Sequence, residues 1–349
     1  MPKQQQVRFS IRLMAAAALA CAAFATAAPV AAQQPYKVID RWKVGGEGGW
    51  DYLNIDSPAH RLYITRGARV DVLDTKTGKL AGSIGGLHGT HGVVFDKAGK
   101  LGFISDGGGN AVVVFDRATL ATVAVIPAGS NPDGMVFEPA TKTVWAFNGK
   151  SHDATVIDAA VLKVVASIPL PGKPEFPVAD GLGSVFVNIE DKNEIVRMAA
   201  NTKTATATWP LAGCESPTGL AFDSAGYRLF SVCDGKKMAV TDAQSGALLG
   251  AAVIGDGPDA AGYSEKYIMA FSSNGEGTLT VVNAATKDYP AIETLPTQKS
   301  ARTMIYDADA DRIYLVAAEF GPKPAPTPEN PRGRPPVIPG SFVVLVVGR

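Results

Sequence analysis

An apolar segment that ends in Asp or Asn recurs at nearly constant spacing along this 349-residue chain. The closing residues stand at successive intervals of 42, 42, 84 and 41: Asp74, Asp116, Asp158, Asp242 and Asn283. The interval of 84 hides one degenerate copy at residues 195–198. A second type of apolar segment brings the count to seven copies, at residues 61–65, 101–105, 144–148, 185–188, 228–232, 267–271 and 312–316. Self-similarity at a fixed period is typical of repeat architectures.

Each copy holds four short runs of β-branched, aromatic and other apolar residues, separated by turn residues such as those at 76–78 and 244–246. Four strands in roughly 40–45 residues is the spacing of one propeller blade. No run in residues 33–349 shows a helical period. We therefore expect an all-β fold, a single seven-bladed β-propeller with four antiparallel strands per blade. The hydrophobic fraction of 46% suffices for its core.

The last copy supplies only three strands, and residues 36–44 have the character of the missing fourth. We expect this N-terminal strand to complete the last blade, which closes the ring and removes exposed sheet edges. The same blade is interrupted by residues 320–340, in which eight of 21 residues are proline. Because proline cannot donate to a sheet ladder, this segment is predicted to be a loop. We expect it to lie over the channel-mouth face as a partial lid or a docking arm.

The first 32 residues have the three parts of a signal peptide. Lys3, Arg8 and Arg12 precede the apolar stretch 13–25, and small residues provide a cleavage site after Ala32. That stretch is too short to span a bilayer comfortably, and no later segment approaches 18 consecutive apolar residues. Residues 33–349 are therefore expected to be periplasmic or secreted, monomeric and without a membrane span.

Charge and motifs exclude several classes of function. Removal of residues 1–32 takes away three cations and no anion, which leaves 30 basic and 33 acidic residues and a net charge of −3. Nucleic-acid binding requires a basic surface, so nucleic acid is not an expected partner. The chain has no Cys-x-x-Cys-His motif and hence no covalent haem. No cofactor is predicted, but a divalent cation remains open.

Residues 131–137, 144–148 and 154–158 follow the YVTN-type β-propeller repeat closely. Over residues 43–348 the chain resembles the YncE-like exported seven-bladed propellers. The resemblance implies the fold. It implies less about function, because related propellers bind proteins, bind nucleic acid, or act as lactonases or cofactor-bearing oxidoreductases. Blade 4 departs from the repeat, with Arg197-Met198 where the repeat has Asp.

In a four-stranded blade, the residue that opens the first strand lies at the mouth of the central channel. Alignment of the seven first strands places there one residue per blade: Asp51, His91, Asp133, Phe176, Thr218, Asp259 and Arg302. The loops of the same face also carry Trp50, His152 and Glu175. These residues predict a ligand-binding site at the channel mouth.

The chemistry of the ring suggests what such a site would bind. Asp51, His91, Asp133 and Asp259 offer ligands for a hard or borderline divalent cation. Arg302 suits a carboxylate or a phosphate. The alternative is structural, because Asp and Asn in loops also shape turns.

Two classes of function fit this ring. The first is a binding or scaffold protein that presents the channel-mouth face to a small molecule or a protein partner. The second is a metal-assisted hydrolase, similar to a lactonase, which needs several convergent metal ligands and an acid or a base. No motif enforces that convergence, so the sequence favours binding and assigns no catalytic residue.

Cys214 and Cys233 are the cysteines that remain after signal cleavage. In an oxidising compartment an isolated pair is more often a disulfide than a catalytic thiol. The two residues fall at the same end of the first two strands of blade 5. Adjacent strands lie about 4.8 Å apart and a disulfide needs Cα atoms about 4.4–6.8 Å apart, so a bond is feasible. The alternative is two buried free thiols.

Overall fold

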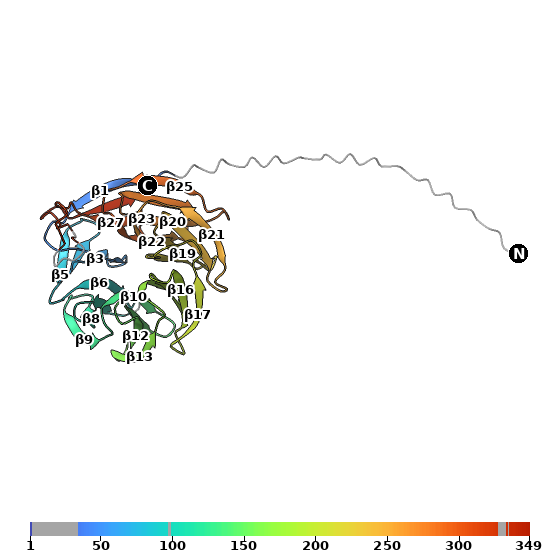
Figure 1. Cartoon of the computed structure of the whole chain (residues 1–349), viewed down its shortest axis with the longest axis horizontal. Coiled ribbons are helices and arrows are strands. Elements are labelled where there is room, and N and C mark those ends of the chain that lie inside the picture. Colours follow the sequence, from blue (N-terminus) through green and yellow to red (C-terminus); the bar gives the residue numbers. More distant parts are fainter. Residues whose placement is uncertain (2–33, 97–98, 327–332, 334) are drawn as a thin grey trace. The chain divides into compact units, whose positions relative to one another are not determined.

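Short apolar runs and the turns between them fold into seven four-stranded antiparallel sheets arranged in a ring (Figure 1). The computed structural model describes Met1 and residues 34–96, 99–326, 333 and 335–349. The predicted signal peptide, apart from Met1, lies outside these residues. Residues 35–349 form one compact unit. The described residues contain strands but no helix, and hence no helix that is long and apolar enough to cross a membrane.

The blades are numbered in chain order, and each is given from its innermost to its outermost strand. Blade 1 comprises β2 (Leu53–Asp56), β3 (Arg61–Thr65), β4 (Val70–Asp74) and β5 (Leu80–Ile84). Blade 2 comprises β6 (Thr90–Phe95), β7 (Leu101–Asp106), β8 (Ala111–Asp116) and β9 (Thr122–Pro127). Blade 3 comprises β10 (Pro132–Glu138), β11 (Thr143–Asn148), β12 (Asp153–Asp158) and β13 (Lys163–Pro169).

Three further blades repeat this up-and-down order. Blade 4 comprises β14 (Pro174–Ala179), β15 (Ser184–Ile189), β16 (Glu194–Ala199) and β17 (Thr204–Pro210). Blade 5 comprises β18 (Leu220–Asp223), β19 (Arg228–Cys233), β20 (Lys237–Asp242) and β21 (Leu248–Val253). Blade 6 comprises β22 (Pro258–Ser264), β23 (Met269–Asn274), β24 (Thr278–Asn283) and β25 (Ala291–Pro296).

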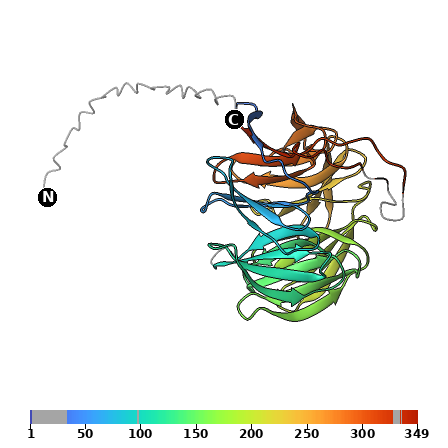
Figure 2. The ribbon, with the colours of Figure 1, turned by 90° about the vertical axis from the view of Figure 1, so that its left-hand side faces the viewer.

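Blade 7 joins the two ends of the repeat region. It comprises β26 (Thr303–Asp307), β27 (Arg312–Ala317), β28 (Val343–Gly348) and, outermost, β1 (Lys37–Lys43). The pairing of β1 with β28 runs from Lys37 opposite Gly348 to Lys43 opposite Val343. Figure 2 shows the blue N-terminal strand beside the red C-terminal strands. The predicted closure of the ring by the N-terminal strand is confirmed.

The Asp that closes four of the repeats has a structural role. The Oδ1 atom of Asp74 accepts hydrogen bonds from the backbone N–H groups of Lys76 and Thr77, both at 2.9 Å. The same turn recurs in blades 2, 3 and 5, at Asp116, Asp158 and Asp242. An Asp side chain that bonds its own backbone two or three residues on sets the turn between the third and outermost strands. The periodic carboxylates therefore organise the repeat and are not part of a ligand site.

The middle strands of each blade are buried on both faces, whereas the outermost strands expose one face. The strands β11 and β15 are buried along their whole length, and Trp145 in β11 is completely buried. The outer strand β13 exposes most of its residues. Neighbouring blades pack face to face, so the middle strands require nearly continuous apolar sequence.

The disulfide between Cys214 and Cys233 is present, with the two Cα atoms 5.4 Å apart. Both cysteines are buried, among Phe186, Leu220 and Leu229. The bond joins the segment that enters blade 5 to the end of β19, and an isolated bridge between Glu215 and Asp234 continues the pairing. The prediction of a disulfide is confirmed.

The proline-rich segment begins and ends as a narrow two-stranded stem. Phe320 forms an isolated bridge with Val337, and the N–H of Gly321 donates to the carbonyl of Pro336 at 2.9 Å. The ring of Phe320 lies 5.9 Å from that of Trp50. Residues 327–332 and 334 lie outside the described part of the chain, so the expected position over the channel mouth stays a prediction.

Candidate functional site at the channel mouth

The strand register decides which residue of each innermost strand stands at the channel mouth. In blades 2, 3, 4 and 6 the first ladder pair is followed by a register shift, and a bulge of this kind re-aims a side chain. The residues just inside these shifts are His91, Asp133, Glu175 and Asp259. The register thus places Glu175 in the ring, and the sequence alignment that placed Phe176 there was wrong by one residue.

Seven residues, one per blade, define what we call the mouth ring: Asp51, His91, Asp133, Glu175, Thr218, Asp259 and Arg302. The second strand of one blade donates side-chain hydrogen bonds to the backbone of the ring residue in the next blade. Ser105 Oγ donates to the carbonyl of Asp133 at 2.6 Å, and Asn188 Nδ2 donates to that of Thr218 at 2.8 Å. Ser273 Oγ donates to the carbonyl of Arg302. Ring positions are therefore set by buried polar contacts rather than by loop conformation alone.

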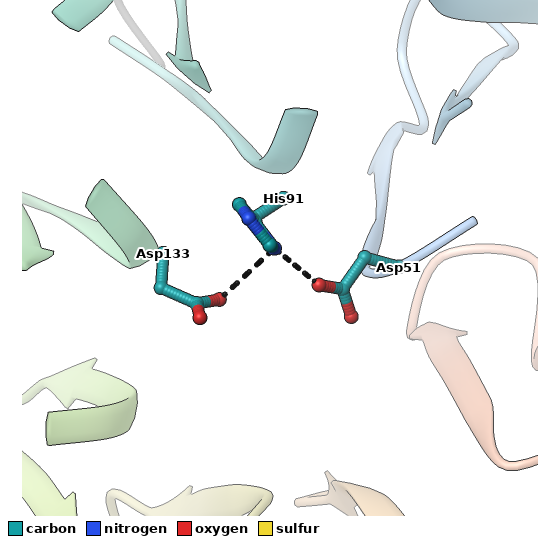
Figure 3. Close-up of side chains that lie close together, drawn as sticks. All are labelled: Asp51, His91 and Asp133. Carbon is teal, nitrogen blue, oxygen red and sulfur yellow. Dashed lines mark hydrogen bonds and ion pairs between the residues drawn. The ribbon is translucent and has the colours of Figure 1, made fainter. Parts of the chain in front are cut away.

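Asp51, His91 and Asp133 come from three consecutive blades and converge (Figure 3). His91 Nδ1 lies 2.6 Å from Asp51 Oδ2 and 3.5 Å from Asp133 Oδ1. One ligand atom from each residue falls within 4.8 Å of the others. The three side chains are partly accessible, with 21% of Asp51, 26% of His91 and 11% of Asp133 exposed. The arrangement combines two carboxylates and an imidazole at an open mouth.

This environment changes the protonation of the cluster. Burial alone would lower the pKa of His91, but the hydrogen bond to Asp51 and the charge of Asp133 outweigh it and raise the pKa to about 9. Burial raises the pKa of Asp133 well above its usual range, and the charge of Asp51 adds to the shift. The unliganded cluster therefore holds protons that an incoming cation would displace.

Tyr52 crosses the channel beneath the mouth ring. Its hydroxyl, from blade 1, donates to Glu175 Oε1 of blade 4 at 3.1 Å. Its ring meets Phe176 edge-on, with centroids 4.8 Å apart. Burial and the surrounding carboxylates, Glu175 first, raise the pKa of the Tyr52 hydroxyl well above its usual range. Tyr52 and Phe176 therefore meet one residue further along the innermost strands than the ring members Asp51 and Glu175, and we call the space that the mouth ring encloses above them the dish.

Lys173 bridges two acids at the blade 4 side of the mouth. Its Nζ lies 3.0 Å from Glu175 Oε2 and also contacts Glu190 Oε2. Burial and the charge of Glu190 raise the pKa of Glu175, while Lys173 opposes the shift. Sequence analysis did not single out Lys173 or Tyr52. The spacing Lys173-x-Glu175 could have indicated Lys173, whereas only the fold shows that Tyr52 extends across the channel to Glu175.

Asp259 of blade 6 and Arg302 of blade 7 form an ion pair in the mouth ring. Arg302 Nη1 lies 3.1 Å from Asp259 Oδ2, but Oδ2 accepts no hydrogen bond. The Asp259 side chain is only 8% exposed, whereas half of the Arg302 side chain is exposed. Burial raises the pKa of Asp259 to about 7, against the opposing charge of Arg302. This pair leaves a buried carboxylate oxygen that has an ion pair but no hydrogen bond, beside an arginine side chain that is half exposed.

The remaining predicted site residues do not join this cluster. Trp50 packs against Phe342, with ring centroids 5.2 Å apart, and against Phe320 of the proline-rich stem. Thr218 Oγ1 donates to the carbonyl of Pro258 at 3.1 Å and so supports the ring backbone. The His152 side chain, in an exposed turn, makes no hydrogen bond or ion pair with any described residue.

The buried acids predict an unusual dependence of stability on pH. Because the pKa of Asp259 is about 7 in the folded chain and about 3.8 when unfolded, the folded state binds more protons between these values. The free energy of unfolding should therefore fall as pH rises from 4 to 7, with Asp259 contributing at most about 4 kcal/mol.

Urea unfolding at pH 5 and pH 7.5 measures this effect. The Asp259→Asn variant should lose less stability between the two pH values than the wild type, since an amide does not ionise. Asp288→Asn, in an exposed turn, is the matched control and should behave as the wild type does. Equal pH dependence in wild type and Asp259→Asn would contradict the prediction.

Comparisons with known proteins support the fold and leave the function open. No family model matches this sequence, and no curated protein matches it. Solved structures do match. Hydrazine synthase of Kuenenia stuttgartiensis has a TM-score of 0.70 at 13% identity, over 77% of this chain and 92% of that one. U3-55K has a TM-score of 0.74 at 8% identity, over 89% of this chain and 99% of that one.

Topology and comparisons agree on the class of protein. The chain is a seven-bladed β-propeller with four antiparallel strands per blade, closed by its N-terminal strand. Similarity at such low identity carries the architecture alone, and function has to be argued from the site.

Proposed function

We propose that this propeller is an exported binding protein that captures a cation, or a ligand with a cationic group, in the dish of the mouth ring. The observation that carries the proposal is the incomplete pairing of the buried ring carboxylates. Among the described residues Asp133 pairs only with His91, at 3.5 Å, and Asp259 Oδ2 has an ion pair with Arg302 at 3.1 Å but accepts no hydrogen bond. A buried charge is costly unless it is paired, so these groups favour an added positive charge.

A divalent metal ion is the simplest such ligand. Asp51, His91 and Asp133 offer two carboxylate oxygens and one imidazole nitrogen, a set that suits Mn²⁺ or Zn²⁺. The backbone of the ring is held by Ser105 and its counterparts, so the ligand atoms are presented by a rigid scaffold. Binding would require neutral His91, and it should therefore strengthen as pH rises.

A metal-assisted hydrolase is the second candidate, and the half-exposed side chain of Arg302 favours it. A metal at Asp51, His91 and Asp133 would polarise a carbonyl or activate water, and Arg302 would hold an anionic substrate group. Assay of the metal-loaded protein against lactones and esters tests this activity. Absence of turnover above the free metal ion would reject the hydrolase and leave the binding proposal standing.

Calorimetric titration of the chelated protein with Mn²⁺, Zn²⁺ and Ca²⁺ tests the binding proposal. We expect one saturable site per chain for at least Mn²⁺ or Zn²⁺, with proton release at pH 7.5 that is visible as a dependence of the heat on the buffer. An organic ammonium ion is titrated in parallel. No heat for any metal ion or for the ammonium ion would refute a cation-binding mouth.

A further inference from the structure

A cavity of about 750 Å³ opens at the end of the channel opposite to the mouth ring. The mouth ring lies where the innermost strands begin, whereas the cavity is lined by residues toward their C-terminal ends. Six of the seven innermost strands contribute to its wall, so it lies on the propeller axis. We call this cavity the lower funnel. No sequence pattern predicted this cavity.

The wall of the lower funnel is apolar and rich in aromatic rings. These aromatic residues are Phe95, Phe137, Phe176, Phe222 and Tyr306. Several aliphatic side chains between them, Val136 and Ile305 among others, are only partly buried by the fold. Concave apolar sites of roughly 300–1,000 Å³ are typical of small-molecule pockets. The funnel therefore has the size and the surface to bind a compact apolar molecule.

The funnel is separate from the mouth ring. Phe176 belongs to its wall, and the ring of Phe176 packs against Tyr52, whose hydroxyl is held by Glu175. This aromatic contact lies between Glu175 of the mouth ring and the funnel. A ligand in the funnel would meet the ring of Phe176 and not the carboxylates above it.

The rim of the funnel carries negative charge that the protein does not neutralise. Arg117 is the cation of the rim, and its guanidinium is fully engaged with Asp56 and with two backbone carbonyls. Asp180 is held ionised by backbone N–H groups and by the hydroxyl of Tyr227, which donates to Oδ2 at 2.8 Å; together they outweigh burial and lower the pKa of Asp180. The carboxylate of Asp309, also at the rim, has no hydrogen-bond or ion-pair partner among the described residues.

From this combination we infer that the lower funnel binds a small molecule with a flat apolar body and a cationic end. The aromatic wall would take the apolar body, and Asp180 and Asp309 at the rim would face the positive group. The inference is independent of the function proposed for the mouth ring, because the two sites share no ligand-contacting residue.

Fluorescence titration with two aromatic probes of opposite charge tests the inference. We expect cationic thioflavin T to bind saturably, one per chain, and anionic 8-anilinonaphthalene-1-sulfonate to bind at least tenfold more weakly. Asp309→Asn should weaken thioflavin T binding severalfold and leave the anionic probe unchanged or improved. Tighter binding of the anionic probe, or no saturable binding of thioflavin T, would overturn the inference.

Steric variants locate the probe. Ala179→Trp and Ile305→Trp place a larger ring on the funnel wall at two separate strands, and each should weaken thioflavin T binding at least tenfold. Ala205→Trp, on the exposed outer strand β17, is the control and should leave it unchanged. Asp133→Asn should also leave it unchanged, which separates this site from the mouth ring. Unaltered binding in both funnel variants, with folding verified by circular dichroism, would place the probe elsewhere.

Discussion

Asp133→Asn is expected to lower the affinity of the channel mouth for Mn²⁺ by at least about 100-fold, since loss of a metal ligand should cost as much as or more than loss of a supporting contact. Asp51→Asn should have an effect of similar size, since it removes a carboxylate and also frees His91 from its 2.6 Å hydrogen bond. Both changes keep the shape of the side chain, so the loss would reflect charge and coordination. Calorimetric titration of each variant measures the effect.

Asp133→Asn should weaken Mn²⁺ binding without lowering the free energy of unfolding. Because burial and the charge of Asp51 raise the pKa of Asp133, its ionised form is disfavoured in the folded chain. Asp133→Asn should therefore be at least as stable as the wild type at pH 7.5, although it binds less Mn²⁺. Asp288→Asn, an exposed carboxylate away from the mouth, should change neither property. Wild-type affinity in both Asp51→Asn and Asp133→Asn would exclude these residues as ligands.

Replacement of both Cys214 and Cys233 by alanine is expected to lower the free energy of unfolding by about 3 kcal/mol, because the bond closes a loop of roughly 20 residues in the unfolded chain. The two cysteines are 19 residues apart and both are buried, so alanine introduces no unpaired polar group. Urea unfolding of residues 33–349 with and without a reductant measures the loss.

The control for this prediction is the double variant itself, whose stability should not respond to the reductant. Thiol labelling of denatured, unreduced residues 33–349, which lack Cys21, provides a chemical check: no cysteine should react before reduction and two should react afterwards. Two labelled cysteines without reduction would show that the bond does not form in solution.

The architecture was largely predictable from the sequence, because a repeat buries the same positions in every copy. The spacing of Asp74, Asp116 and Asp158 predicted the blades, and those carboxylates prove to hold the turn that recurs in each. The N-terminal strand was predictable for a related reason, since the last copy lacked one strand. Residues 2–33 lie outside the described part of the chain, so the export signal stays a prediction from the sequence.

The positions of the mouth-ring residues were predictable from the sequence, but the contacts between their side chains were not. Alignment of equivalent strand starts found six of its seven residues, and the bulge after Pro174 explains the error at Phe176. Which ring members meet depends on the angle between blades and on side-chain length, and neither is encoded in spacing. The approach of His91 to two aspartates and the reach of Tyr52 across the channel were therefore beyond a reading of the sequence.

The lower funnel escaped prediction because its wall is made of ordinary strand residues. In sequence, Val136 and Ile305 look like core positions of innermost strands, and nothing distinguishes them from buried neighbours. Only closure of the ring leaves their inner edges without a packing partner. The lower funnel follows from the number of blades and from the way they close into a ring.

Anomalous diffraction from crystals of the chelated protein soaked with Mn²⁺ tests the central claim most directly. We predict an anomalous peak at the channel mouth, about 2.0–2.3 Å from a carboxylate oxygen of Asp51, an oxygen of Asp133 and a ring nitrogen of His91, which are typical metal–ligand distances. An equivalent soak of Asp133→Asn should show a weaker peak or none. No Mn²⁺ peak within the mouth ring of the wild type, at a concentration that saturates any calorimetric signal, would contradict the account.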